Sequence, residues 1–314
     1  MHSSFSLDKA LRRKAIVWGA SGFLGIHLTN RLVAEGFKVT CVSRSPSVHW
    51  SGGISYLQSD LLSYDDAVAN EMTGAYVFHL ASMTRPSSFT DTASSELNWN
   101  VIPTLNYLEK TRQLNCRWIF TSSGGTVYGL PQSPQVDEEH PTRPISSYGV
   151  SKLAMEGYFQ VYNSIHGTNF STARIANLYG PYQNPKAGQG IIATLIDRII
   201  NDQIIEIWGD GSNVRDFIYA NDVCTALISM ADNGQSGRIY NVGSGTGATI
   251  NEIIGMVSSY LHKKPKVVYK PARGMDIPKN ILDISRISKE LQWSPMISLG
   301  DGIGETCEWF LGST

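Results

Sequence analysis

Tyr148 and Lys152 are the two residues whose types and spacing could do acid–base chemistry. They stand four residues apart in the segment Tyr-Gly-Val-Ser-Lys, so on a helix they lie on one face, one above the other. A free tyrosine has a pKa of about 10, but a neighbouring ammonium favours the phenolate and lowers the pKa of the phenol. The pair therefore predicts a group that takes a proton from a hydroxyl or returns one to a ketone. The spacing alone is weak, because Tyr and Lys are common on helix surfaces.

A glycine-rich loop near the start of the sequence predicts a phosphate site. Gly19-Ala-Ser21-Gly22-Phe23-Leu24-Gly25 follows an expected strand and opens an expected helix. Glycines in this place allow a tight turn and let backbone N–H groups approach a pyrophosphate at the positive end of the helix. The spacing is G-x-x-G-x-x-G rather than G-x-G-x-x-G, and an ordinary strand–helix turn is the alternative interpretation.

Two polar residues further on bear on which dinucleotide the loop would hold. NAD-binding proteins usually carry an acid at the end of the second strand, where it bonds the ribose 2′-hydroxyl. Here Arg44 stands at that place, and an arginine can pair with a 2′-phosphate, so the prediction is NAD or NADP. A surface arginine in a turn is the other interpretation. Asp60 is a candidate partner for adenine, or a cap for the following helix.

The elements that must position these residues alternate along the first half of the chain. Expected strands lie at 15–18, 38–43, 54–58, 76–80, 117–121 and 169–174, with expected helices at 25–35, 95–112 and 148–165. This alternation predicts an α/β fold, a Rossmann-type doubly wound parallel sheet, with a smaller C-terminal α/β lobe. The predicted domains are 1–176 with about 215–246 for the dinucleotide, and about 177–214 with 247–314 for the substrate.

Composition excludes several classes of protein. The chain has 314 residues, is 42% hydrophobic and carries a formal net charge of −1, so it lacks the field that would attract nucleic acid or anionic lipid. The four cysteines are far apart without a C-x-x-C pair, and no two histidines have H-x-x-x-H spacing. These features predict reduced thiols in a cytoplasmic protein and no metal site. No apolar run has membrane-spanning length.

Further motifs occur in a fixed order along nearly the whole chain. They are Asp60-Leu61, His79-Leu80-Ala81-Ser82, Ser122-Ser123-Gly-Gly-Thr-Val-Tyr128-Gly129, Arg174-x-x-Asn177-x-Tyr-Gly-Pro181, Trp208-Gly-Asp-Gly211, Arg215-Asp-Phe-Ile-Tyr219, Tyr240-Asn-Val-Gly243, Arg273-Gly-Met-Asp276 and Leu282-Asp-Ile-Ser285. With the glycine loop and the Tyr148/Lys152 pair, they resemble the extended short-chain dehydrogenase/reductase family. Within it they are most similar to the nucleotide-sugar epimerases of the UDP-glucose 4-epimerase kind.

This resemblance implies roles for particular residues. Tyr148 is the acid/base, and Lys152 tunes it while binding the nicotinamide ribose. A serine or threonine that bonds the substrate hydroxyl usually stands where this chain has Gly124, because the chain carries an extra glycine. Ser123 is therefore the first candidate for this role and Ser122 the second.

The resemblance also implies two binding sets. The cofactor set is Gly19, Ser21, Gly22, Phe23, Leu24, Gly25, Arg44, Asp60, Leu61, Leu80, Ala81, Ser82, Tyr148 and Lys152. The set for a nucleotide-sugar substrate is Ser122, Ser123, Asn177, Arg215, Arg273 and Asp276. Arg215 and Arg273 suit a pyrophosphate because guanidinium groups bind it bidentately, and Asp276 suits a ribose diol. Surface ion pairs are the alternative for each.

The loop after Ser123 bears on the reaction. Related dehydratases resemble S-T-D-E-V-Y-G here and need the acid pair, whereas this chain has Gly124, Gly125 and Thr126, which argues against dehydration. Two reactions remain. One is NAD-dependent 4-epimerisation of a UDP-hexose or UDP-N-acetylhexosamine, which the order of motifs favours. The other is NAD(P)H-dependent reduction of a nucleotide-linked, for example dTDP-linked, 4-keto-6-deoxyhexose, which Arg44 favours. A non-catalytic dinucleotide-binding protein is a third class, and the intact Tyr148/Lys152 pair argues against it.

Two more expectations come from the resemblance. Asn280 stands seven residues after Arg273, where a large tyrosine in the family restricts bulky groups at C2 of the sugar. The smaller asparagine predicts that N-acetylhexosamines can enter. Relatives often dimerise through two helices that correspond to 95–112 and 148–165, so a homodimer is expected.

Overall fold

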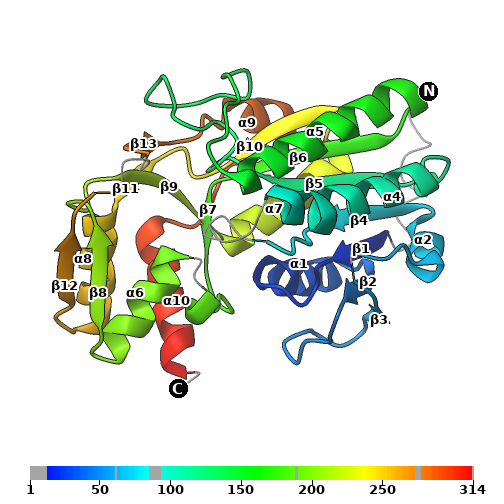
Figure 1. The fold of residues 1–314 in the computed structure, drawn as a ribbon. Helices are drawn as coiled ribbons and strands as arrows, with labels where there is room; N and C mark the ends of the chain where they lie inside the picture. Colours follow the sequence, from blue (N-terminus) through cyan, green and yellow to red (C-terminus); the bar gives the residue numbers. More distant parts are fainter. Residues whose placement is uncertain (1–12, 61, 85–92, 188–189, 273–276, 313–314) are drawn as a thin grey trace.

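A seven-stranded parallel sheet forms the centre of the larger part of the molecule (Figure 1). The computed structural model describes residues 13–60, 62–84, 93–187, 190–272 and 277–312. In spatial order the strands are β10 (Arg238–Val242), β6 (Asn169–Ile175), β5 (Arg117–Ser123), β4 (Ala75–His79), β1 (Lys14–Trp18), β2 (Lys38–Ser43) and β3 (Ser55–Gln58). The order reverses between β1 and β4, and ligands of open α/β sheets bind at the carboxyl ends of the strands beside such a reversal. The predicted Rossmann-type fold is confirmed.

Helices cover both faces of this sheet because its strands are apolar on both sides. Ala15 and Val17 of β1 belong to one buried cluster, whereas Ile16 and Trp18 belong to the other. The first cluster packs against α1 (Phe23–Ala34), α7 (Ala220–Asn233) and α9 (Ser285–Leu291). The second packs against α2 (Asp66–Met72), α4 (Ile102–Thr111) and α5 (Ser147–His166).

The helix expected at 95–112 is a composite of three pieces. It consists of α3 (Ala93–Glu96), a π-helix (Leu97–Val101) and α4. Pro103 lies in the first turn of α4 and has no N–H to donate to the preceding turn. Single π turns of this kind are rare and occur often at functional sites. The extent of the helix was predicted, whereas the π turn was not.

A smaller lobe lies beside the large sheet and holds most of the C-terminal residues (Figure 1). Its four-stranded sheet has β9 (Val214–Tyr219) paired with β11 (Gly247–Thr249), β13 (Lys279–Asn280) and β7 (Asn177–Tyr179). A parallel pair, β8 (Ile204–Trp208) and β12 (Lys266–Lys270), lies next to α6 (Ile191–Ile200), α8 (Ile250–Leu261) and α10 (Leu299–Gly312). One apolar cluster joins these helices to β9. The lobe thus contains β9, while α7 and β10, which follow β9 in the chain, return to the large sheet.

Candidate active site

Tyr148 and Lys152 lie in the first two turns of α5, at the carboxyl end of β5. The helix begins after Ser146, whose side chain accepts a hydrogen bond from a backbone N–H of the first turn and so caps the helix. The Lys152 side chain is buried, and its Nζ donates to the carbonyl oxygen of Thr121, 3.0 Å away in β5. Nζ also lies 5.6 Å from the centre of the Tyr148 ring. The structure therefore brings the predicted pair together at the ligand-binding edge of the sheet.

Burial dominates the electrostatics of this pair. It lowers the pKa of Lys152 to about 8, and the charges of Glu96 and Glu156 oppose that shift. The pKa of Tyr148 is raised, first by burial and then by the charge of Glu96. The expectation that Lys152 lowers the pKa of Tyr148 is thus not met in the chain by itself. The reason is that burial and the Glu96 charge both favour the neutral phenol, while the Lys152 ammonium bonds the Thr121 carbonyl.

The two candidate serines have different environments. Ser122 is buried, and its hydroxyl donates to Oε1 of Glu156. Ser123, the last residue of β5, is half-buried, and its hydroxyl has no hydrogen bond within the described part of the chain. The hydroxyl of Ser123 can therefore bond a substrate, whereas that of Ser122 is already engaged.

Gly124 lies against the side chain of Leu282. A Cβ built on it would lie 2.6 Å from Cδ1 of Leu282 and 3.1 Å from the carbonyl oxygen of Arg174. A serine or threonine at Gly124 would therefore require Leu282 to move, whereas a Cβ at Gly125 would meet only Oγ of Ser123 at 3.9 Å. The Gly124 carbonyl oxygen accepts a hydrogen bond from Nδ2 of Asn280 at 3.0 Å.

The glycine loop fits the pyrophosphate of a dinucleotide. Gly19 has φ +89°, and a Cβ on it would lie 2.8 Å from the backbone nitrogen of Ala81, so only glycine fits against the end of β4. Gly22 precedes α1 without a side-chain cap, and the first turn of α1 has no acidic residue. The N–H groups and the positive end of α1 are therefore suited to an anion.

The other predicted cofactor residues surround this loop. Arg44 is exposed just after β2. Oδ1 of Asp60 accepts hydrogen bonds from the backbone nitrogens of Leu62 and Ser63, and α2 is capped by Asp65 instead, so Asp60 is not the helix cap. Ser21, Phe23 and Leu24 lie at the start of α1, and Leu80, Ala81 and Ser82 follow β4. Leu61 is outside the described residues.

Two of the predicted substrate residues, Asn177 and Arg215, lie at β9. Nδ2 of Asn177 donates to the carbonyl oxygen of Asp216 at 2.9 Å. Arg215 is the register partner of Asn280 in β13, and Asn280 bonds Gly124. The strand that carries Arg215 is therefore tied to the loop that carries Ser123. Arg273 and Asp276 lie outside the described residues.

Comparison with known proteins gives the family. The family model for the NAD dependent epimerase/dehydratase family matches residues 15–243. The chain belongs to this family. A putative UDP-glucose 4-epimerase from Methanocaldococcus jannaschii is 31% identical over 94% of this chain and 97% of the relative. A dTDP-4-dehydro-6-deoxyglucose reductase from Escherichia coli is 29% identical over 94% of this chain and 96% of the relative.

A solved structure agrees with this assignment. UDP-glucose 4-epimerase from Thermotoga maritima, solved with UDP-glucose, superposes with a TM-score of 0.89 at 29% identity and covers 96% of this chain and 99% of that one. The recognition of a nucleotide-sugar epimerase family from the ordered motifs is confirmed. The family description names NAD, and use of NADP through Arg44 stays a prediction.

This member of the epimerase/dehydratase family also holds two buried glutamates that sequence reasoning missed. Glu156 forms an ion pair with Arg174, with 2.7 Å between Oε2 and the guanidinium nitrogen. Glu96 contacts α5 through the side chain of Ser151. A lone glutamate in a helical pattern gives no signal in the sequence, because its burial depends on what packs against it.

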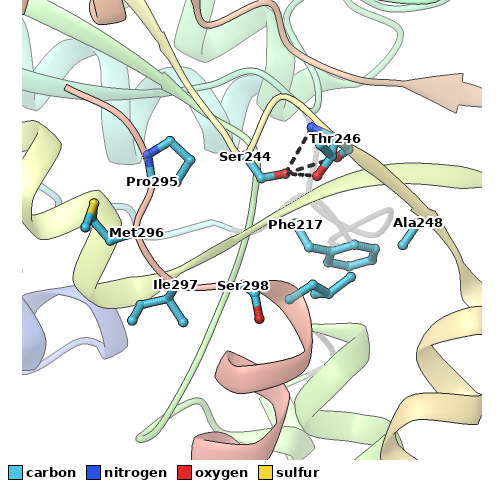
Figure 2. Close-up of a pocket in the computed structure, with 9 residues that line it drawn as sticks. Phe217, Ser244, Thr246, Ala248, Pro295, Met296, Ile297 and Ser298 are labelled. Carbon is cyan, nitrogen blue, oxygen red and sulfur yellow. Dashed lines mark hydrogen bonds between the residues drawn. The ribbon is translucent and has the colours of Figure 1, made fainter. Parts of the chain in front are cut away.

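A cavity of about 380 Å³ lies beside β9 of this epimerase-family protein (Figure 2). Its lining is formed by Phe217, Ser244, Thr246, Ala248, Pro295, Met296, Ile297, Ser298 and Leu299. No predicted catalytic or substrate residue belongs to that lining, although Phe217 is the register partner of Asn177 and Ala248 that of Arg215. Among the described ranges, no group of three or more His, Cys, Asp or Glu side chains could hold a metal ion. No helix described here is long and apolar enough to cross a membrane.

Proposed function

We propose that the protein is an NAD-dependent nucleotide-sugar 4-epimerase that acts on a UDP-hexose or a UDP-N-acetylhexosamine. The observation that carries this proposal is the hydrogen bond from Asn280 to the carbonyl oxygen of Gly124. This bond links the paired strands β9 and β13, of which β9 carries Arg215, to the loop that carries Ser123. The proposed pyrophosphate ligand Arg215 and the proposed hydroxyl ligand Ser123 are therefore connected through Asn280. The similarity to epimerases over nearly the whole chain supports the same reaction.

The residues of the site divide the work of the reaction. The glycine loop of Gly19, Gly22 and Gly25 would hold NAD, which would supply hydride chemistry at C4 of the sugar. Tyr148 takes the proton of the C4 hydroxyl during oxidation and returns one to the same oxygen during reduction. Ser123 donates a hydrogen bond to that oxygen and fixes its position. Lys152 is in place to bond the nicotinamide ribose, and Arg215 holds the pyrophosphate while the keto sugar turns over.

The test supplies purified protein with UDP-glucose, UDP-galactose or their N-acetyl forms, without added cofactor. An epimerase keeps its NAD through the cycle, so interconversion of the two sugars is expected. The alternative is a reductase of a dTDP-linked 4-keto-6-deoxyhexose, which the exposed Arg44 and the reductase relative favour. Consumption of NADPH on such a substrate, without interconversion of UDP-sugars, would replace the epimerase proposal by the reductase.

The environment of Asn280 supports the proposal that UDP-N-acetylhexosamines are among the substrates. The residue is 4% exposed, and its Oδ1 has no hydrogen-bond partner among the described residues, which is costly for a buried polar atom. We propose that a substrate hydroxyl or amide N–H meets this oxygen. The variant Asn280→Tyr should lower turnover of UDP-N-acetylglucosamine relative to UDP-glucose. An unchanged ratio of the two rates would refute this role.

The outer surfaces of α4 and α5 support a homodimer. On α5 the exposed apolar residues follow helical spacing, and the neighbouring π turn and α4 add three more. They are Val150, Tyr158, Val161 and Ile165 on one side, and Leu97, Trp99 and Ile102 on the other. We propose that a second copy of the chain covers this surface.

The four cysteines, all free and buried, fit a reducing compartment such as the cytoplasm.

Sedimentation of two charge variants tests the dimer. Val161→Glu places a charge inside the proposed interface and should give particles with the mass of one chain. Val48→Glu changes a residue that is 93% exposed and far from the interface in sequence, so it should sediment as the parent protein does. A parent protein with the mass of one chain would exclude the dimer.

A further inference from the structure

Glu96 is a buried carboxylate next to the candidate acid/base pair. It ends α3 and is 3% exposed. Its Oε2 accepts hydrogen bonds from Oγ1 of Thr84 at 2.8 Å and from Nδ2 of Asn100 at 3.1 Å. Oγ of Ser151 lies 2.9 Å from this oxygen. All three donors are neutral, so the charge of Glu96 has no compensating cation among them.

The contact with Ser151 reaches directly into the candidate site. Ser151 lies on α5 between Tyr148 and Lys152, and its Oγ is 2.9 Å from both Glu96 Oε2 and the carbonyl oxygen of Tyr148. The one hydroxyl hydrogen can serve either acceptor. Glu96 therefore touches the turn of α5 that carries the acid/base pair, from the side of the π turn.

The other charged groups around this pair are compensated or neutral. Glu156 on α5 is paired with Arg174 of β6. His79 of β4 is neutral near pH 7, because burial and then the charge of Lys152 lower its pKa to about 3. Among the described residues, the charge of Glu96 raises the pKa of both Tyr148 and Lys152, whereas that of Glu156 raises the pKa of Lys152.

We propose that Glu96 is a positioning residue that holds the first turns of α5 through Ser151 and favours the neutral phenol of Tyr148 together with the charged ammonium of Lys152. The inference rests on the proposed function of that pair. It assigns Glu96 a role in fixing where the proton resides before substrate binds. The effect on both partners has one direction, since the Glu96 charge raises the pKa of Tyr148 and of Lys152.

The test is the pH dependence of the variant Glu96→Gln. Glutamine keeps an oxygen that can accept the same hydrogen bonds but removes the charge, so both pKa values fall. The pair titrates as a unit with macroscopic pKa values, and the sign does not depend on which group loses its proton first. We expect the rising limb of the kcat/KM profile for UDP-sugar interconversion to move to lower pH by about one pH unit.

A titration without substrate separates this inference from the proposed reaction. The tyrosinate absorbance of Tyr148 is obtained by subtracting the titration of Tyr148→Phe, and the same subtraction is made in the Glu96→Gln background. A midpoint that moves to lower pH supports the role of Glu96 even if no UDP-sugar is converted. A protein that converts no UDP-sugar would refute the proposed function alone.

Three variants complete the experiment. Glu109→Gln removes an exposed charge from α4 and should leave the profile in place. Ser151→Ala keeps the Glu96 charge but removes the contact, so it should lower kcat without moving the limb. Glu96→Asp keeps the charge and provides a folded comparison if Glu96→Gln does not fold. The rising limb of its kcat/KM profile should lie at the same pH as that of the parent protein. A folded Glu96→Gln protein with an unmoved limb and an unmoved Tyr148 midpoint would overturn the proposal, as would Glu96→Asp with the limb displaced to lower pH.

Discussion

Two buried glutamates contact the same helix, and their surroundings differ in kind. Glu156 faces the Arg174 guanidinium, which donates from Nε and Nη2 to its carboxylate oxygens. Glu96 faces neutral donors from Thr84, Asn100 and Ser151. A carboxylate paired with arginine is largely cancelled at a distance, whereas one held by neutral donors keeps its field. Both charges raise the pKa of Lys152, but only that of Glu96 is also a cause of the raised pKa of Tyr148, so we assign Glu156 mainly to the fold and Glu96 to the chemistry of Tyr148.

The largest effect should come from changing Tyr148, the residue on which the charge of Glu96 acts. Tyr148→Phe removes the hydroxyl that exchanges the proton, so turnover should fall on the order of 10³-fold. The ring remains, so binding of NAD, measured by calorimetry, should be nearly unchanged. Activity within tenfold of the parent would mean that Tyr148 is not the acid/base, and the contrast between the two glutamates would lose its chemical meaning.

Breaking the ion pair on the Glu156 side should affect stability instead. Arg174→Met leaves a buried carboxylate without its cation, and the free energy of unfolding should fall by about 3–5 kcal/mol. Arg238→Met breaks a partly exposed pair with Glu290 and should cost less than about 1 kcal/mol. Urea unfolding measures both. Equal losses in the two variants would contradict the distinction between buried and exposed pairs.

The same measurement on Glu96→Gln sharpens the comparison. This change leaves no charge unpaired, so the loss should stay near 1 kcal/mol, in the range of a single hydrogen bond. A loss as large as that of Arg174→Met would show that Glu96 serves the fold as Glu156 does.

The sequence predicted those parts of the site that depend on local spacing. The Tyr148/Lys152 pair and the glycine loop each lie within one turn or one helix start, so their residues meet whatever the rest of the chain does. The alternation of strands and helices likewise predicted the large sheet. The smallest elements, such as β7 and β13, were missed because two or three residues carry no periodic signal.

Contacts between distant residues could not be predicted in this way. Asn280 bonds Gly124 across 156 positions of the chain, and that contact depends on the register of β13 against β9. The burial of Glu96 depends on how the π turn packs against α5. The contact that crowds a side chain at Gly124 comes from Leu282. In each case the sequence shows the residue, whereas its neighbour follows from the tertiary structure.

The two adjacent serines, Ser122 and Ser123, show the same contrast between a structural and a catalytic role. Ser122 bonds Glu156 and belongs to the structural side, whereas Ser123 faces the site. Ser123→Ala should lower kcat by about 10²-fold with unfolding unchanged, because a donor to the reacting oxygen is lost. Ser122→Ala should lower the free energy of unfolding by about 1 kcal/mol and leave kcat within a few-fold. Kinetics and urea unfolding of both variants decide which serine bonds the reacting oxygen. A large loss of kcat in Ser122→Ala with a loss of stability in Ser123→Ala would assign that role to Ser122.

A further effect concerns how the free energy of unfolding varies with pH. Burial lowers the pKa of Lys152 from 10.5 to about 8, so between these values the unfolded chain binds more protons than the folded one. Lys152 therefore makes stability rise with pH in that window, by at most about 1.4 kcal/mol per pH unit, and its destabilising effect is complete below about pH 8. Subtracting the unfolding free energies of Lys152→Met from those of the parent at pH 8, 9 and 10 isolates this slope, since all other groups are shared. The exposed Lys110, changed to Met in the same way, should show no such difference. If the difference for Lys152 also did not change with pH, the pKa of Lys152 would be the same in the folded and unfolded chain. The Glu96 charge would then offset the desolvation cost of the Lys152 ammonium as fully as Arg174 offsets the charge of Glu156.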